Sequence, residues 1–287
     1  MNPVSYGVSL PSPGDGLDPV AFAVGAEHHG LDFVSVSDHP AIGDPTHEPW
    51  TLLSWIAAST SRIRVATKVL GVPFRWPAMI AKMAETLDRL SDGRLILGLG
   101  GGYDDREMHS LGVGTRTPGE KVDGLEETIR ILRGLWSEAE FSFQGRRYEI
   151  DRAQMQPKPT HPIPIWLGTY GPRALALTGR LADGWVPSLG FLDPANIPPL
   201  RARIVDAARQ AGRAPEQITF VCNLAIQLDG ARPAEPSIVS GSTAQILERL
   251  TEIRELGFTS MNFNLSGGSR SEQLQRLAEE ILPSLRA

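Results

Sequence analysis

Residues 95–111 read LILGLGGGYDDREMHSL: an apolar run leads directly into three glycines, and acidic residues then open a helical stretch. A strand-to-loop junction of this kind is where an α/β enzyme presents backbone amides to an anionic ligand. Gly100, Gly101 and Gly102 lack a Cβ where a ligand would approach the backbone, although glycine serves equally well in a tight turn without a ligand. The stretch therefore predicts an α/β fold and leaves both uses of the glycines open.

The rest of the chain repeats this strand-then-helix pattern. Short β-branched runs alternate with amphipathic segments, which is typical of a parallel sheet built from βα units. The clearest helical segment is 120–136, where Val122, Leu125, Ile129 and Leu132 form one apolar stripe. We predict strands at 4–10, 33–37, 63–70, 95–99, 163–167, 185–187, 218–228 and 260–265.

Eight such units predict a closed (β/α)8 TIM barrel that occupies residues 1–287 as a single domain. The rival fold is an open doubly wound sheet, which has about five or six units and carries its glycine loop after the first strand instead of the fourth. Two stretches interrupt the repeat. Residues 141–150 predict a small hairpin inserted before the fifth barrel strand, and residues 227–241 predict a surface loop after the seventh.

Composition argues against several classes of partner. The net charge of −5 lacks the basic excess that binds nucleic acid or an anionic membrane surface. The first basic residue is Arg62 and no apolar run approaches the length of a membrane span, so we expect a cytoplasmic protein without a secretory signal. The single cysteine, Cys222, lies in an apolar strand and is interpreted as a packing thiol.

Polar residues follow several predicted strands, where barrel enzymes form their active sites. Residues 37–40, SDHP, place a His beside an Asp, which suits acid/base chemistry near neutral pH but also suits a helix-capping Asp beside a solvated His. Lys68 lies in an otherwise apolar strand and must reach a rim or a polar cleft. Residues 168–173, GTYGPR, combine glycine, a hydroxyl, a helix N-terminus and an arginine; this favours phosphate, although Pro172 also suits an ordinary helix entry.

Two other kinds of site have weaker support. No HxH follows the first strand and no HExxH occurs, which argues against a metal site. No GxSxG elbow is present, which argues against a serine nucleophile. We therefore predict no metal. The scattered His and Asp residues considered as ligands are His28, His29, Asp38, His39, Asp44, His47 and His161.

Together these motifs resemble a known family. SDH after the second strand, TKVL at the third, GLGGGYDDREM after the fourth, PIPIWLGTYGPR around the fifth and ADGW at 182–185 follow the order and spacing of the bacterial luciferase-like monooxygenase superfamily. The resemblance covers nearly the whole chain and implies the same barrel. The Asp-His pair is most similar to the branch that uses the deazaflavin coenzyme F-420. The FMN branch tends to carry a longer lid insertion, for which 287 residues leave little room.

The resemblance implies a coenzyme site. Asp38 and His39 would flank the reactive face of the deazaflavin, and His39 would exchange the proton that accompanies hydride transfer. Lys68–Val69 matches a non-prolyl cis peptide behind the ring. The glycine cluster would pass along the coenzyme tail, and residues 168–173 would hold its phosphate. The residues implied to contact the coenzyme are Asp38, Thr67, Lys68, Val69, Gly100, Gly101, Gly102, Gly168, Thr169, Tyr170, Gly171 and Arg173.

The chain also departs from the sugar-phosphate dehydrogenases of this branch. Tyr103 stands where those enzymes place a catalytic glutamate, so either His39 works alone or Tyr103 donates the proton. The chain has only four lysines, none in the later loops that clamp the sugar phosphate, which argues against such a substrate. The candidates for an apolar, aromatic substrate pocket, any of which could instead serve packing, are Trp50, Phe74, Trp76, Tyr103, Trp185 and Phe191.

The resemblance thus predicts an F-420-dependent oxidoreductase that moves a hydride between the coenzyme and a small organic substrate. An FMN-dependent two-component monooxygenase is the first alternative, and a flavin-binding relative without turnover is the second. The implied partners are a second copy of the chain in a homodimer and a separate F-420 or flavin reductase that supplies reduced coenzyme.

Overall fold

Eight parallel strands form the centre of the molecule in the computed structural model, which describes residues 4–41, 43, 45–228, 230, 235 and 237–286. The strands are β1 (Ser5–Ser9), β2 (Phe33–Val36), β3 (Arg64–Thr67), β5 (Leu95–Gly100), β8 (Ile165–Leu167), β9 (Gly184–Trp185), β10 (Thr219–Gln227) and β12 (Ser260–Leu265). Each pairs with the next, and β12 pairs with both β10 and β1, so the ring closes. The predicted barrel is confirmed, and every predicted strand is present.

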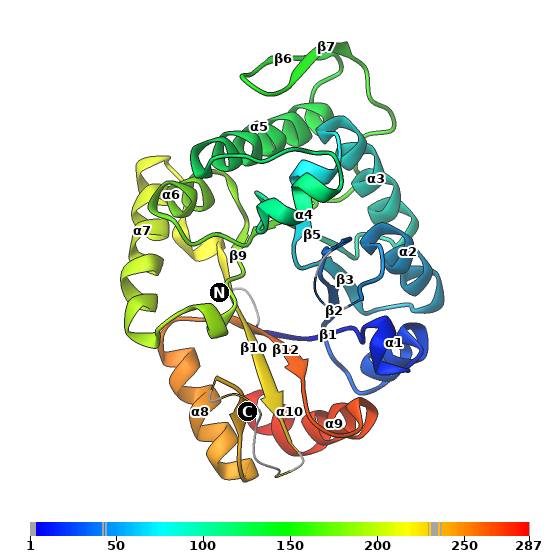
Figure 1. Ribbon diagram of the computed structural model, residues 1–287, viewed down its shortest axis with the longest axis vertical. Helices are drawn as coiled ribbons and strands as arrows, with labels where there is room; N and C mark the ends of the chain where they lie inside the picture. Colours follow the sequence, from blue (N-terminus) through cyan, green and yellow to red (C-terminus); the bar gives the residue numbers. More distant parts are fainter. Residues whose placement is uncertain are drawn as a thin grey trace.

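Helices cover the outside of this barrel in the ring that Figure 1 shows. They are α1 (Pro19–His28), α2 (Pro49–Ser59), α3 (Pro77–Leu90), α4 (Asp105–Ser110), α5 (Pro118–Ser137), α6 (Pro172–Leu181), α7 (Ile197–Gln210), α8 (Thr243–Glu255), α9 (Arg270–Arg276) and α10 (Leu282–Arg286). Several begin at a proline, whose missing N–H costs nothing in the first turn. Thr117 and Glu120 add a capping box at α5.

The third barrel strand is broken after Thr67. It was predicted as one strand over 63–70, but β3 pairs with β2 and β5, whereas the short β4 (Leu70–Gly71) pairs only with β5, further along. The peptide bond Lys68–Val69 between the two pieces is cis, as the family resemblance implies. The Lys68 side chain consequently leaves the strand at the carboxyl end of the barrel, where the active sites of such folds lie.

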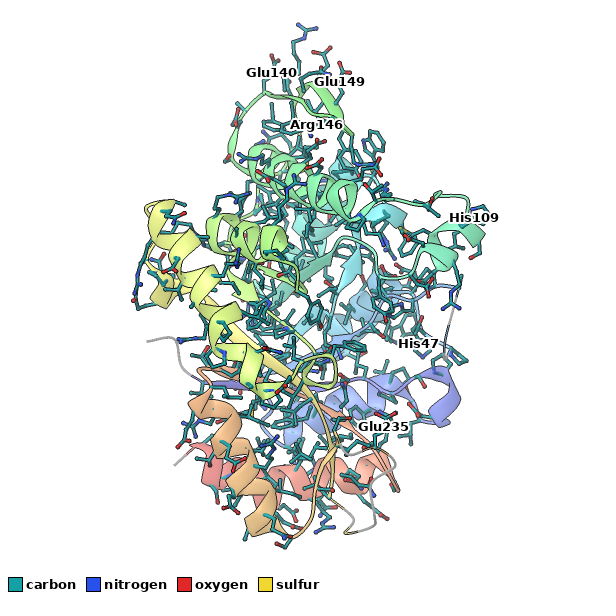
Figure 2. All side chains as sticks on the ribbon, turned by 60° about the vertical axis from the view of Figure 1, so that its left-hand side comes forward. His47, His109, Glu140, Arg146, Glu149 and Glu235 are labelled. Carbon is teal, nitrogen blue, oxygen red and sulfur yellow. The ribbon has the colours of Figure 1, made fainter. Side chains whose placement is uncertain are left out.

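The predicted hairpin consists of β6 (Phe141–Gln144) and β7 (Glu149–Ala153), paired antiparallel. Figure 2 shows Glu140, Arg146 and Glu149 at its outer end, beyond α5. The buried carboxylate of Glu127 on α5 holds its turn, because it accepts hydrogen bonds from three successive amides, 146 to 148, at 2.8 to 3.0 Å. The hairpin therefore extends away from the barrel instead of covering it. The predicted loop 227–241 is only partly described, and its end forms β11 (Val239–Ser240) beside β10.

The inside of the barrel has an apolar layer below a polar one. Phe33 and Val221 belong to the apolar layer, and two residues further along the same strands Ser35 and Asn223 point to the same interior face. The polar layer therefore lies toward the carboxyl ends of the strands. Cys222 is fully buried and burial raises the pKa of its thiol, which agrees with a packing role.

Candidate active site

His39 follows β2 and is oriented by a carboxylate from α4. Its Nδ1 lies 3.3 Å from Oε2 of Glu107, whose side chain is buried. The other Glu107 oxygen accepts a hydrogen bond from the backbone N–H of Ala41 at 3.1 Å. Because a carboxylate only accepts, the contact favours a proton on Nδ1 of His39 and leaves Nε2 for exchange. The His39 side chain is 41 % exposed, so the imidazole is held on one side and open on the other.

The Asp38 carboxylate is directed away from His39 and Glu107, toward the loop after β4. The carboxylate accepts hydrogen bonds from the guanidinium of Arg75 at 2.6 and 3.1 Å and from the N–H of Gly71 at 2.8 Å. Burial would lower the pKa of Arg75, but hydrogen bonds and charges from Asp38 and Glu48 raise it. Both Asp38 oxygens are thus used to join the end of β2 to the loop after β4. The carboxylate that orients His39 is Glu107, not its neighbour in sequence.

The glycines of β5 make room for the chain between β3 and β4. A Cβ on Gly98 would lie 2.0 Å from the carbonyl oxygen of Thr67, and a Cβ on Gly100 would lie 2.7 Å from Cγ2 of Val69. A Cβ on Gly168 would lie 3.2 Å from the same Val69 methyl group. Gly102 has a φ of +91°, a backbone conformation that residues with a side chain rarely adopt. Most of the glycine cluster is therefore required for packing, whatever it binds.

A cavity of about 380 Å³ lies between the loops that follow β5 and β8. Gly101, Gly102 and residues 168–174 line it together with the start of α5. The N-cap Gly171 supplies no side chain to the first turn of α6, so the first amides of that helix remain for an anion. The guanidinium of Arg173 bonds to the carboxylate of Asp123 on α5, which fixes the wall of the cavity. The Thr169 hydroxyl is buried and bonds to Thr178 at 2.8 Å.

Three aromatic rings meet at the rim. Tyr103 stacks on Phe191, with ring centroids 6.1 Å apart, and meets the His39 ring edge-on at 6.5 Å. Tyr170 contacts the other side of Phe191, and its hydroxyl oxygen accepts a hydrogen bond from the Ser188 N–H at 2.9 Å. Burial raises the pKa of Tyr170. Tyr103 is 75 % exposed, so an apolar surface and a free hydroxyl lie beside His39.

A second cavity, of about 360 Å³, lies on the β12–β1–β2 side of the mouth. Hydroxyl and amide groups dominate its wall, and Lys68 is its central cation. The Lys68 ammonium donates to Oδ1 of Asn223 and Oδ1 of Asn264, both at 3.1 Å. Burial lowers the pKa of Lys68 to about 8. Thr46, also in this wall, donates to the carbonyl oxygen of His39 at 2.8 Å, so the His39 backbone adjoins this cavity through Thr46.

Comparison with known proteins identifies the family. A sequence model described as luciferase-like monooxygenase matches residues 12–235, which is most of the chain. The chain belongs to this family. Curated relatives include the F-420-dependent glucose-6-phosphate dehydrogenases of Nakamurella multipartita, 28 % identical over 99 % of this chain and 97 % of the relative, and of Kineococcus radiotolerans, 30 % identical over 92 % of each. The first alignment spans 331 positions, so that relative carries segments that this chain of 287 residues lacks.

Solved structures agree on the fold of this luciferase-like protein. An F-420-dependent secondary alcohol dehydrogenase, solved with an F-420-acetone adduct, superposes with a TM-score of 0.88 over 99 % of this chain and all of the other. At 18 % identity the similarity concerns the fold alone. Among the helices that the structure describes, none is long and apolar enough to span a membrane.

The aromatic residues considered for the substrate pocket lie in different surroundings in this luciferase-like chain. Trp185 is fully buried in the core, stacked on Phe258, and its indole N–H donates to the carbonyl oxygen of Thr169. Trp50 is buried at an outer groove between α2 and α3. Phe74 packs on Gly71, next to Asp38. Of the six candidates, Tyr103 and Phe191 are exposed and stack on each other at the mouth, because loop residues reach the rim whereas strand and helix residues pack inward.

Sequence reasoning missed Glu107 and Arg75, which support the site. Glu107 resembled one more acidic residue in the first turn of α4, where Asp104 is the actual cap. Its complete burial, which only the fold reveals, distinguishes it. The described ranges bring no three His, Cys, Asp or Glu side chains together as a metal site. Asp44, one of the scattered candidates, lies outside those ranges.

Proposed function

We propose that this protein is an F-420-dependent oxidoreductase in which His39 exchanges the proton that accompanies hydride transfer. The observation that carries the proposal is the position of His39. Its Nδ1 contacts Glu107, and its ring meets Tyr103, which directly follows two glycines of one cavity wall. Its backbone carbonyl accepts a hydrogen bond from Thr46 in the wall of the other cavity. Such an arrangement can hold a coenzyme on one side and a substrate on the other, with an acid/base group at the junction.

The glycine-walled cavity fits the coenzyme. Backbone without side chains at Gly101, Gly102 and Gly168 allows a flat or extended group to approach closely, and Val69 packs beside Gly168 as an apolar support. The amides at the start of α6 suit the phosphate of the coenzyme tail. F-420, when bound, supplies the acceptor or donor of the hydride. The curated relatives named above carry F-420 in their names, which favours it over FMN.

The residues of this chain accept and donate the proton that accompanies hydride transfer. When an alcohol is oxidised, the hydride leaves its carbon and the hydroxyl proton must leave its oxygen; Nε2 of His39 is the open nitrogen that can accept it. Glu107 stabilises the imidazolium that results. In reduction the same nitrogen returns the proton. Tyr103 presents a second hydroxyl beside the same ring and is the alternative donor.

Coenzyme binding provides the first test. F-420 and FMN, each oxidised and reduced, are titrated into the protein, and quenching of coenzyme fluorescence or calorimetry gives the dissociation constants. We expect F-420 to bind at least tenfold more tightly than FMN. Tighter FMN binding, with oxygen consumption that depends on a flavin reductase, would support the monooxygenase alternative. F-420 binding without turnover of alcohols, enones or nitro compounds would support a relative without catalysis.

The proton role is tested by His39→Ala, with His109→Ala as the matched control. His109 is an exposed histidine on α4, labelled at the outer side of the molecule in Figure 2. His39→Ala should lower kcat by about 100-fold or more and change F-420 affinity by less than about threefold, whereas His109→Ala should change neither. Full turnover in His39→Ala would remove His39 from the mechanism.

We also propose that the protein forms a homodimer through α2 and α3. Trp55 on α2 is 68 % exposed, and Met79 and Leu90 on α3 are 55 % and 81 % exposed. Several exposed apolar side chains of this size on two helices are typical of a protein interface. Light scattering after gel filtration should give twice the chain mass for the wild type and a smaller mass for Trp55→Asp. A wild-type monomer at micromolar concentration would contradict the proposal.

A further inference from the structure

The cavity on the β12–β1–β2 side of the mouth combines hydroxyl and amide side chains with apolar ones around Lys68. Ser9, Ser35 and Asn264 line it, and further hydrogen bonds link these groups inside the barrel. Asn223 Oδ1 accepts from Lys68 at 3.1 Å, from Asn262 at 2.8 Å and from Asn264 at 3.2 Å. The network therefore directs amide oxygens at the ammonium and holds it in one place.

The charge of Lys68 is solvated by this network but not neutralised. Both of its hydrogen-bond partners are amide oxygens, and no carboxylate in the described part of the chain lies within 4.0 Å of Nζ. The other cation of the wall, Arg270, is already paired with Asp15 at 3.1 Å. The cavity thus carries one net positive charge. Burial, with no opposing carboxylate, is also what lowers the pKa of Lys68.

The ammonium has one donor left for a ligand. An ammonium group carries three N–H donors, and the two amide oxygens take two of them. Lys68 lines the cavity, so the third donor is available on the cavity side. A partly buried cation without a carboxylate partner favours an anionic group as the natural occupant.

We propose that this cavity binds the substrate through a carboxylate held by Lys68, so that the protein acts on a small organic acid. The identification of the bound acid as substrate rests on the proposed function; the anion site itself does not. The Ser9 and Ser35 hydroxyls lie in the same wall as further polar groups. Because Thr46 joins this wall to His39, an acid anchored here extends its remaining atoms toward the imidazole.

A carboxylate fits this site better than a phosphate monoester. One uncompensated cation matches one negative charge, whereas a phosphate monoester carries nearly two near neutral pH. Phosphate sites commonly add an arginine fork or several backbone amides. Here those features belong to the other cavity, at the start of α6, and Arg270 is occupied by Asp15. The site therefore differs from one for a sugar phosphate.

The test uses pairs of molecules that share a shape and differ in charge. Benzoate and benzamide, and 4-phenylbutanoate and its amide, are titrated into the protein by calorimetry, with and without F-420. At pH 7 we expect at least one acid to bind about tenfold or more tightly than its amide, because a charge-assisted hydrogen bond is lost in the amide. The preference should disappear in Lys68→Met and persist in Lys68→Arg, which keeps the positive charge.

Several results would overturn the proposal. No preference for any acid over its amide would do so, as would a preference that survives in Lys68→Met while circular dichroism shows a folded protein. Tighter binding of glucose 6-phosphate than of every acid, abolished in Lys68→Met, would replace the carboxylate by a phosphate. Measurements without F-420 separate the two proposals: an acid preference that depends on Lys68 stands even if F-420 fails to bind. If F-420 binds but no acid is preferred, the proposed function stands alone.

Discussion

The close approach of β5 to the segment after β3 makes a sharp prediction for Gly98→Ala. The new Cβ would lie 2.0 Å from the carbonyl oxygen of Thr67 and 3.2 Å from Cγ1 of Val69. Because the first of these atoms is backbone in a central strand, no rotamer change can relieve the clash. The carbonyl oxygen of Gly98 also accepts the Thr67 hydroxyl at 2.7 Å, so any displacement of β3 disturbs that bond as well.

The expected cost follows from the size of that overlap. Overpacking a core usually costs about 1 to 3 kcal/mol when side chains can yield. Here the strand itself must shift by about an ångström to restore ordinary contact, so we expect about 3 kcal/mol or more. For a chain of this size that corresponds to a fall in Tm of about 6 to 12 °C. F-420 affinity should also fall, because Val69 moves with the strand.

Urea denaturation followed by far-UV circular dichroism measures the change in unfolding free energy. Gly190→Ala is the matched control, because a Cβ there meets no atom within 4 Å and the backbone has no positive φ. That variant should lie within about 1 kcal/mol of the wild type. A Gly98→Ala protein with the wild-type urea midpoint would refute the packing argument. It would also favour the alternative that these glycines are required for ligand binding instead of packing.

Three further predictions concern charged groups. Burial raises the pKa of Glu27, but hydrogen bonds from residues 61–63 outweigh it and lower the pKa from 4.5 to about 2. Glu27→Gln should therefore lower the free energy of unfolding by about 1 to 2 kcal/mol at pH 7, a range already reduced for the solvent exposure of Glu27. The difference in stability from wild type should vanish as pH falls from about 4.5 through about 2. A stability difference that does not depend on pH in urea titrations would contradict this prediction. Glu107→Gln should lower kcat about tenfold or more while the Kd for F-420, from fluorescence quenching, stays within about threefold; an unchanged kcat would show that His39 needs no carboxylate. Since the pKa of Lys68 is about 8, calorimetric affinity for the preferred acid should be constant below that pH and fall about tenfold per unit above it. A flat affinity profile to pH 10 would exclude the Lys68 ammonium as the partner of the acid.

The fold could be predicted because its signals are local. Each barrel strand is a short apolar run bounded by glycine, proline or polar residues, and each outer helix shows a periodic stripe such as Leu125, Ile129 and Leu132, all of which are buried. The break after Thr67 could not be predicted from the residues alone, because TKVL continues the apolar pattern. It depends on which neighbour each piece pairs with, and pairing is a property of the assembled sheet.

The candidate site was predictable only where one stretch of chain supplies it. Residues 168–173 form a wall of the coenzyme cavity because glycine, proline and the helix start follow one another directly. The partners of Asp38 and His39 come from Arg75 and Glu107, far along the chain, and no local pattern links them. Trp185 was a candidate for the substrate pocket but is buried in the core, because a large ring in a strand can point into the core as readily as into a pocket.

Glu107 also changes the meaning of Tyr103, which stands where a catalytic glutamate was expected. A carboxylate is present four residues later, but both of its oxygens face protein: one contacts Nδ1 of His39 and the other the N–H of Ala41. Buried in that position it cannot reach a substrate, so it acts by holding the imidazole in one orientation. The groups open to the mouth are then His39 Nε2 and the Tyr103 hydroxyl. Of the two, His39 has its orientation fixed by a buried partner, and a fixed orientation is what general acid/base catalysis requires.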